Sequence, residues 1–275
     1  MKKLMLLTTV FVLLAIPAYS AIQYEFVQRT TKQDTSIPTT ELMGRAILDG
    51  TRSRIDFTGG DVYPTGTYMV SIDGSRRLYF VDPENKWYTE VNTAGIASAV
   101  AASNIEIANL KSNLEKVGDG EVVAGHATEH YKLTITYDIT VPFKGLPLKQ
   151  SVRTVIDTWS SPKFGEAGRS AFENAIRTGN VQVDKLVETE TTKVHGLPLR
   201  QSVTITMSVA SGKPVKTELP LPVTRTITRE TWITKIGEAA PDAMTFKIPA
   251  TYRKADQPNT PAPPMEVLNM QPVSK

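Results

Sequence analysis

Alternation of apolar and polar residues is the feature of this sequence that most constrains its fold. From His130 to Val141 apolar or aromatic side chains alternate with polar ones. The same period of two recurs from Leu199 to Val209 and from Ile22 to Phe26. This period is typical of a strand with one buried and one solvated face. Further strands are predicted at residues 43–49, 51–58, 67–73, 76–82, 86–92, 151–159 and 223–236.

Short turns join the predicted strands. Asp49-Gly50 and Asp73-Gly74 suit tight hairpins, because Gly and Asp tolerate positive φ. Strands this close in sequence favour an antiparallel meander over βαβ units. The chain is therefore predicted to be mainly β, of the α+β type, and not a doubly wound nucleotide-binding fold.

Two segments have apolar residues at helical spacing. Residues 94–117 are predicted to form a helix that ends at Gly118, and a second helix is predicted at residues 166–178. Residues 181–193 fit a strand or a helix equally well. The apolar stripe of the first helix consists of Ile96, Val100, Ile107, Leu110 and Leu114.

The first twenty residues resemble an export signal. Lys2 and Lys3 precede an apolar run over residues 4–16, and small residues lead to a predicted cleavage between Ser20 and Ala21. The apolar run would span only about 20 Å as a helix, which is too short for a hydrocarbon core of ~30 Å. A signal peptide over residues 1–20 is therefore predicted, with no transmembrane segment after its removal.

Composition excludes several kinds of site in the exported chain. The sequence contains no Cys and three His, and loss of Lys2 and Lys3 lowers the formal net charge from +3 to +1. Without Cys there is no disulfide, Cys-ligated zinc, iron–sulfur cluster or lipidated N-terminal Cys. A nearly neutral chain also lacks the positive excess of a nucleic-acid binder. We expect no cofactor and no nucleic-acid partner.

The C-terminus differs in composition from the rest of the chain. Five prolines and few aromatic residues lie between Asp256 and Lys275, which is typical of disorder. We therefore predict one domain over residues 21–252 and a Pro-rich disordered tail over residues 253–275.

One octapeptide occurs twice, 51 residues apart. Gly145-Leu-Pro-Leu-Lys-Gln-Ser-Val152 recurs as Gly196-Leu-Pro-Leu-Arg-Gln-Ser-Val203, with a single Lys-to-Arg difference. One interpretation is an internal duplication or a pair of binding loops. The other is two similar strand starts, because Pro is tolerated at the first residue of a strand.

Four stretches of the sequence resemble a known family. They are Gly44–Phe57, residues 77–83 with 86–90 (RLYFVDP and KWYTE), residues 123–133, and Gly196-Leu-Pro-Leu199 with Phe246-Lys-Ile-Pro249 and Tyr252. Together they are similar to secreted bacterial proteins that are classified as a domain of unknown function and grouped by fold with the LolA/LolB-like periplasmic lipoprotein carriers.

The resemblance implies a strongly curved antiparallel sheet or half-open barrel, with helices covering its concave face over an apolar cleft. The predicted helix at residues 94–117 would be one such cover. The absence of Cys after the signal peptide excludes a lipid-anchored, LolB-like form and implies a periplasmic or extracellular protein. The residues expected to line the cleft are Ile96, Val100, Ile107, Leu110, Leu114, Tyr131, Leu133 and Ile135.

No residue cluster predicts catalysis or metal binding. His126 and His130 lie four positions apart, which on a strand is about 13 Å, too far for one zinc ion with Zn–N bonds of about 2.1 Å. The sequence has neither a Gly-x-Ser-x-Gly nucleophile motif nor a Gly-rich phosphate loop. We expect neither an enzyme nor a metal protein.

A group of arginines has two interpretations. It could bind an anionic headgroup, because Arg pairs bidentately with phosphate or carboxylate. It could also consist of solvated strand positions with cross-strand acid partners such as Glu90 and Asp56. The arginines are Arg52, Arg54, Arg76 and Arg77, with Tyr63, Tyr79 and Trp87 nearby in sequence.

Two functions fit the sequence. The first is an exported, periplasmic protein that binds or carries a lipid or another hydrophobic ligand in a concave apolar site. The second is a non-catalytic envelope protein that binds a protein partner through a sheet edge or its Pro-rich tail.

Overall fold

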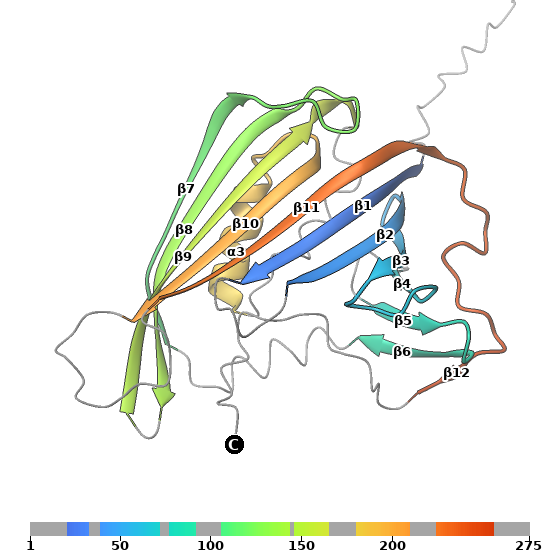
Figure 1. Ribbon diagram of the computed structural model, residues 1–275, viewed down its shortest axis with the longest axis horizontal. Coiled ribbons are helices and arrows are strands. Elements are labelled where there is room, and N and C mark those ends of the chain that lie inside the picture. The colour runs from blue at the N-terminus through green and yellow to red at the C-terminus, as the bar shows by residue number, and fades with distance from the viewer. Residues whose placement is uncertain are drawn as a thin grey trace, which may run out of the picture.

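A single curved, open β-sheet dominates the structure (Figure 1). The computed structural model describes residues 21–32, 39–71, 77–91, 106–143, 146–164, 180–209 and 224–255. Within these residues the sheet has twelve strands, and all neighbours pair antiparallel except β12 and β6. In spatial order the strands are β12 (Arg253–Lys254), β6 (Trp87–Val91), β5 (Leu78–Asp82), β4 (Tyr68–Ser71), β3 (Arg52–Gly60), β2 (Thr40–Asp49), β1 (Ala21–Lys32), β11 (Thr224–Ala239), β10 (Leu197–Val209), β9 (Leu146–Ser161), β8 (Glu129–Phe143) and β7 (Glu106–Asp119).

The register of the long strands separates two faces. Across β8, β9, β10 and β11, one row of paired residues consists of Ile135, Thr154, Ile205 and Ile227. The adjacent row points to the opposite side of the sheet and consists of Thr134, Val155, Thr204 and Thr228. Helix α3 (Val181–Thr191) packs on the side of Ile135 and Ile227. We call this side the helix face and the opposite side the far face. Figure 1 shows α3 lying behind β9 and β10.

The segment at residues 181–193, for which the sequence allowed a strand or a helix, forms helix α3 over Val181–Thr191. Asn180 caps its N-terminus, because its Oδ1 accepts hydrogen bonds from the backbone N–H groups of Gln182 and Val183 at 3.0 and 3.2 Å. Val183 and Val187 are buried against the sheet. The local sequence is rich in Val and Thr, which favour strands. Packing and the cap, more than propensity, therefore make this segment helical.

The helix predicted at residues 94–117 is wrong for residues 106–117, which is the part of this range that the structure describes. Residues 106–117 belong to strand β7, whereas residues 94–105 lie outside the described residues, as does the predicted helix at 166–178. A β-bulge between Ala108 and Lys111 explains the error, with Asn109 at a φ of 55°. The extra residue puts Ile107 and Leu110 on one face three positions apart. Leu114 follows four positions later, which is two strand periods.

Bulges also bend the centre of the sheet. The register shifts at Glu25/Phe26 in β1 and at Met43/Gly44 in β2. Such bulges bend a strand and increase its twist. Gly44 allows the ring of Phe26 to lie against the backbone, since a Cβ there would come within 2.7 Å of that ring.

The chain after β11 crosses the far face of strands β3–β6. We call residues 240–255 the strap. Phe246 is buried against Tyr68, Val70 and Val81. The strap ends in β12, which begins at Arg253, the first residue of the predicted tail.

The predicted strands are confirmed within the described residues. The repeated octapeptides mark the starts of β9 at Leu146 and β10 at Leu197. Because these two strands are antiparallel neighbours, the two copies lie at opposite ends of the strand pair. Gly196 has a φ of 88°, and a Cβ there would come within 2.3 Å of the carbonyl oxygen of Ser161. The second copy thus needs its glycine for close backbone packing.

Candidate apolar site under helix α3

The apolar surface between α3 and strands β7–β11 is the candidate site. We call it the α3 cluster. Four strands and the helix contribute its buried members, and partly buried residues surround them. The buried members are Leu133, Ile135, Tyr137, Ile139, Val152, Ile156, Val183, Val187, Met207 and Ile227, and the partly buried ones are Ile107, Leu110, Leu114, Leu186, Val203 and Ile205.

The structure brings five of the eight predicted lining residues into this cluster. Ile107, Leu110 and Leu114 come from β7, and Leu133 and Ile135 from β8. Tyr131 is buried on the same face of β8, but its hydroxyl donates to Glu129 Oε2 at 2.5 Å. The other two, Ile96 and Val100, lie outside the described residues.

Few contacts hold α3 on the sheet among the described residues. Burial of Val183 and Val187 stabilises this contact by about 2 kcal/mol for each side chain. The hydroxyl of Ser112 on β7 donates to Glu190 Oε1 at 3.3 Å. An isolated helix of this length is marginal in water, so α3 depends on these contacts.

Tyr137 lies at the interface between β8 and α3. Burial raises the pKa of its hydroxyl to about 12, and the negative charge of Asp184 on α3 adds to this effect. The phenol therefore stays neutral in the physiological range. Its ring belongs to the α3 cluster, so it presents an apolar body and a polar tip to the helix.

Two buried oxygens on the sheet accept no hydrogen bond from the described part of the chain. They are Gln150 Oε1 and Ser160 Oγ, and both residues are almost fully buried. Gln150 pairs with Ile139 and Val209, which places it at one end of the α3 cluster. A buried polar atom normally has a hydrogen-bond partner, so these two oxygens are exceptions among the buried polar atoms of the sheet.

Sequence reasoning missed the cations on the helix face. Arg225 and Arg229 flank Ile227 on β11, and Lys32 pairs directly with Ile227 from β1. All three side chains are half-buried. The signal was present in the alternation of residues 223–236, because residues two positions from a buried Ile share its face.

His126 lies in a hairpin turn, and His130 lies on the far face of β8. Val123 and His126 exchange backbone hydrogen bonds across a tight turn, and His126 packs edge-on against Phe164. His130 Nε2 lies 2.8 Å from Asp157 Oδ1, and its ring stacks on Trp159 at 4.5 Å. Among the described residues, no three His, Asp or Glu side chains come close enough to hold a metal ion.

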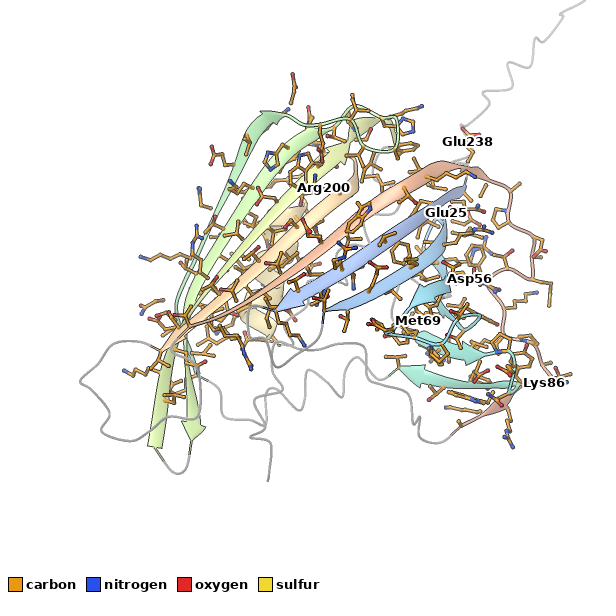
Figure 2. All side chains as sticks on the ribbon, viewed as in Figure 1. Glu25, Asp56, Met69, Lys86, Arg200 and Glu238 are labelled. Carbon is orange, nitrogen blue, oxygen red and sulfur yellow. The ribbon has the colours of Figure 1, made fainter. Side chains whose placement is uncertain are left out.

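Arg200 completes a stack on this far face. Its guanidinium lies 4.6 Å from the ring centre of Trp159 and forms an ion pair with Glu121. Figure 2 labels Arg200 on β10. The stack follows the register of three strands, since His130 pairs with Trp159 and Trp159 pairs with Arg200.

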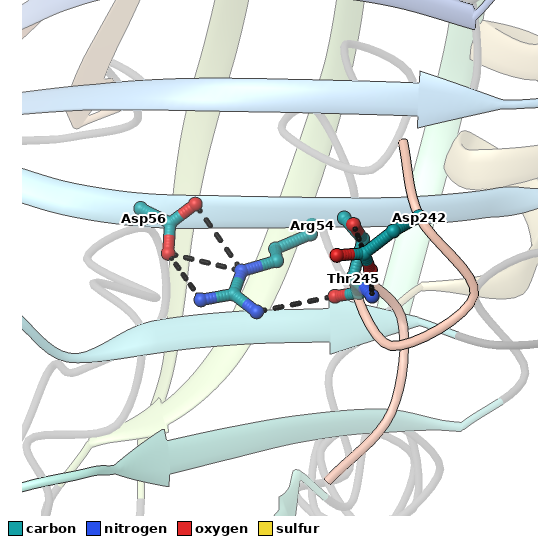
Figure 3. Close-up of polar contacts among 4 residues, drawn as sticks. All are labelled: Arg54, Asp56, Asp242 and Thr245. Carbon is teal, nitrogen blue, oxygen red and sulfur yellow. Dashed lines mark hydrogen bonds and ion pairs between the residues drawn. The ribbon is translucent and has the colours of Figure 1, made fainter. Parts of the chain in front are cut away.

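The arginines near residue 54 have structural partners. Arg54 Nη2 donates to Asp56 Oδ1 at 2.7 Å, and its Nη1 donates to the carbonyl oxygen of Thr245 at 3.1 Å (Figure 3). Arg52 pairs with Asp49 and lies 4.7 Å from the ring centre of Phe246. These contacts support the interpretation that they pair with acids, although Asp56 lies on the same strand as Arg54.

Within the described residues, no helix has the length and apolar character that a membrane crossing requires. The signal peptide predicted for residues 1–20 lies outside that part of the chain.

Comparison with solved structures finds similar chains, of which one is described here. A solved LolA superfamily protein of Nitrosomonas europaea matches 83% of this chain and 90% of its own, with 9% sequence identity and a TM-score of 0.32. Its superfamily is the one that the sequence resembles. No protein-family profile matches the sequence, and neither does any curated protein.

Proposed function

We propose that this protein is an exported, periplasmic binding or carrier protein for a lipid or another hydrophobic ligand, and not an enzyme. The observation that carries the proposal is the α3 cluster. It places a wide apolar face under one short helix, with partly buried Ile107, Leu110 and Leu114 at its margin. Ligand sites of this class are mostly apolar and contain few polar groups.

Helix α3 is the movable part of this site. Among the described residues its contact with the sheet includes two buried valines, the partly buried Leu186 and the Ser112–Glu190 hydrogen bond, whereas the strands are held by backbone ladders. Elements with few buried contacts open at a lower free energy than the whole protein. An acyl chain would replace the contacts of Val183 and Val187 when α3 moves away.

The alternative function, binding of a protein partner through a sheet edge, has less support. Strand β7 is the last strand of the sheet in the described part of the chain. However, β7 contains two bulges and carries Lys111 and Lys116. Bulges and lysines are the features by which natural sheets prevent strand addition. The Pro-rich tail, the other surface of that alternative, lies outside the described residues.

The neutral fluorescent probe N-phenylnaphthylamine tests the proposal, because its emission rises in an apolar site. We expect the protein to bind it, and native mass spectrometry of gently purified protein to detect a retained lipid. Leu110→Gln with Leu114→Gln should weaken probe binding about tenfold, since each change puts a polar group on the apolar face.

Val117→Gln is the matched control on the same strand, because Val117 is 49% exposed and lies outside the α3 cluster. It should leave probe binding unchanged. Absence of both probe binding and retained lipid in the unmodified protein would refute the proposed function.

A further inference from the structure

We infer that the hydrophobic ligand is an acyl molecule with an uncharged head, and that this head donates a hydrogen bond to Gln150 Oε1. This inference rests on the proposed function and specifies its ligand. The repeated octapeptide supplies the first observation, because Gln150 and Gln201 are equivalent positions of its two copies.

The two glutamines border the α3 cluster at opposite ends. Both lie on the helix face, and each is 6% exposed. Gln150 pairs with Ile139 of the cluster, whereas Gln201 pairs with Thr158, two positions beyond Ile156 on β9. Gln150 and Thr158 are about 26 Å apart along β9 at 3.3 Å per residue. This distance exceeds half of the ~30 Å hydrocarbon core of a bilayer, so an acyl chain can lie between the two glutamines.

The two glutamines differ in their hydrogen bonds. Gln201 Nε2 donates to Thr158 Oγ1 at 3.5 Å. Gln150 Oε1 is buried and accepts no hydrogen bond from the described part of the chain. An unpaired buried acceptor costs free energy, because water no longer solvates it. A donor at the end of a bound chain would recover this loss.

The surroundings of Gln150 favour an uncharged head. Tyr137 lies in the adjacent row of the helix face, where it pairs with Val152, and the negative charge of Asp184 on α3 acts on its hydroxyl. A carboxylate head would bring a second negative charge to this end of the cluster and would offer acceptors only. A hydroxyl or an amide N–H donates to Gln150 Oε1 without adding charge.

The cations of the helix face do not provide an open site for an acidic head. Lys32, Arg225 and Arg229 each have an interaction of their own. An acidic head would have to compete with these interactions. Gln150 Oε1 has no hydrogen bond from the described residues to lose, so a donor gains a contact there at no such cost.

Competition of decanol and decyl methyl ether for bound N-phenylnaphthylamine tests the inference. The two compounds share the chain and the oxygen of the head, but only the alcohol donates a hydrogen bond. We expect Gln150→Met to reduce the advantage of decanol over the ether about fivefold, because one hydrogen bond to a buried acceptor is lost. Competition by the ether should not change, which also shows that the variant is folded.

Gln201→Met is the matched control, because Gln201 has the same exposure and the equivalent place in the second octapeptide. It should keep the decanol-to-ether ratio of the unmodified protein. An unchanged ratio in Gln150→Met, or an equal fall in both variants, would overturn the inference and leave the hydrophobic carrier intact. Failure of the probe itself to bind would overturn both.

NMR of the unmodified protein gives a readout that needs no substitution. We expect decanol to shift the side-chain amide resonances of Gln150 more than the ether does, whereas those of Gln201 should respond equally to both compounds. Equal shifts at Gln150 would overturn the inference.

Decanoate provides the charged head in the same displacement assay. We expect it to displace the probe more weakly than decanol does. Stronger displacement by decanoate would show that the site takes an acidic head and would also overturn the inference.

Discussion

Arg54 joins the strap to the sheet by three kinds of contact. It pairs with Asp56, donates to the carbonyl oxygen of Thr245, and lies 3.9 Å from the ring centre of Tyr68. Its side chain is 24% exposed, so these interactions are only partly screened by solvent. One side chain therefore connects β3, β4 and the strap.

Arg54→Ala should lower the free energy of unfolding by about 1–3 kcal/mol, because it removes a partly buried charged donor from several partners. Urea denaturation measures this change. The control is Arg45→Ala on the neighbouring strand, where an exposed pair with Glu25 should contribute less than about 1 kcal/mol. Equal effects of the two substitutions would contradict the role assigned to Arg54.

The carboxylate of Asp242 holds a turn in the strap. Its Oδ1 accepts hydrogen bonds from the backbone N–H groups of Met244 and Thr245 at 2.8 Å and from the Thr245 hydroxyl at 3.0 Å. These bonds hold the pKa of Asp242 below its ordinary value of 3.8. A lowered pKa means that the stabilisation is complete above pH 3.8 and is lost as the pH falls below it.

Asp242→Ala should therefore reduce stability at neutral pH and have a smaller effect at about pH 3. Urea denaturation of both proteins at the two pH values measures the difference. If the difference in the free energy of unfolding between the two proteins stays constant down to about pH 3, the ionised carboxylate does not hold the turn.

At the scale of elements, the strands could be predicted from sequence because alternation reports directly which face is buried. Strand β7 could not, because the bulge at Asn109 converts a strand period into a helical one. Helix α3 was ambiguous because its Val and Thr residues favour strands, whereas the Asn180 cap and the apolar contacts of Val183 and Val187 stabilise the helix.

Asn180→Ala should loosen α3 specifically. The substitution removes the acceptor for two backbone N–H groups and should cost about 0.5–2 kcal/mol in helix stability. Hydrogen exchange of the amides in α3 should become faster, while exchange in β9 and β10 stays slow. If hydrogen exchange becomes faster by the same factor in the helix and in the sheet, α3 does not open separately from the sheet.

At the scale of the whole molecule, the sequence reveals a sheet with one apolar face but not the residues at its margin. Five of the predicted lining residues lie in the α3 cluster: alternation identifies Leu133 and Ile135, and the spacing that was interpreted as a helix identifies Ile107, Leu110 and Leu114. Lys32 joins Arg225 and Arg229 around Ile227 only through the pairing of β1 with β11, two strands separated by almost the whole chain. Such long-range register is not encoded in any local pattern.

A crosslink between α3 and β7 tests most directly whether the surface under α3 takes up ligand. The protein has no Cys, so Ser112→Cys with Glu190→Cys introduces the only two thiols. These positions are in hydrogen-bond contact, and a short bis-thiol reagent can bridge them. The bridged protein should lose uptake of N-phenylnaphthylamine, whereas the same double variant without the bridge should retain it. Equal uptake with and without the bridge would show that ligand does not enter under α3.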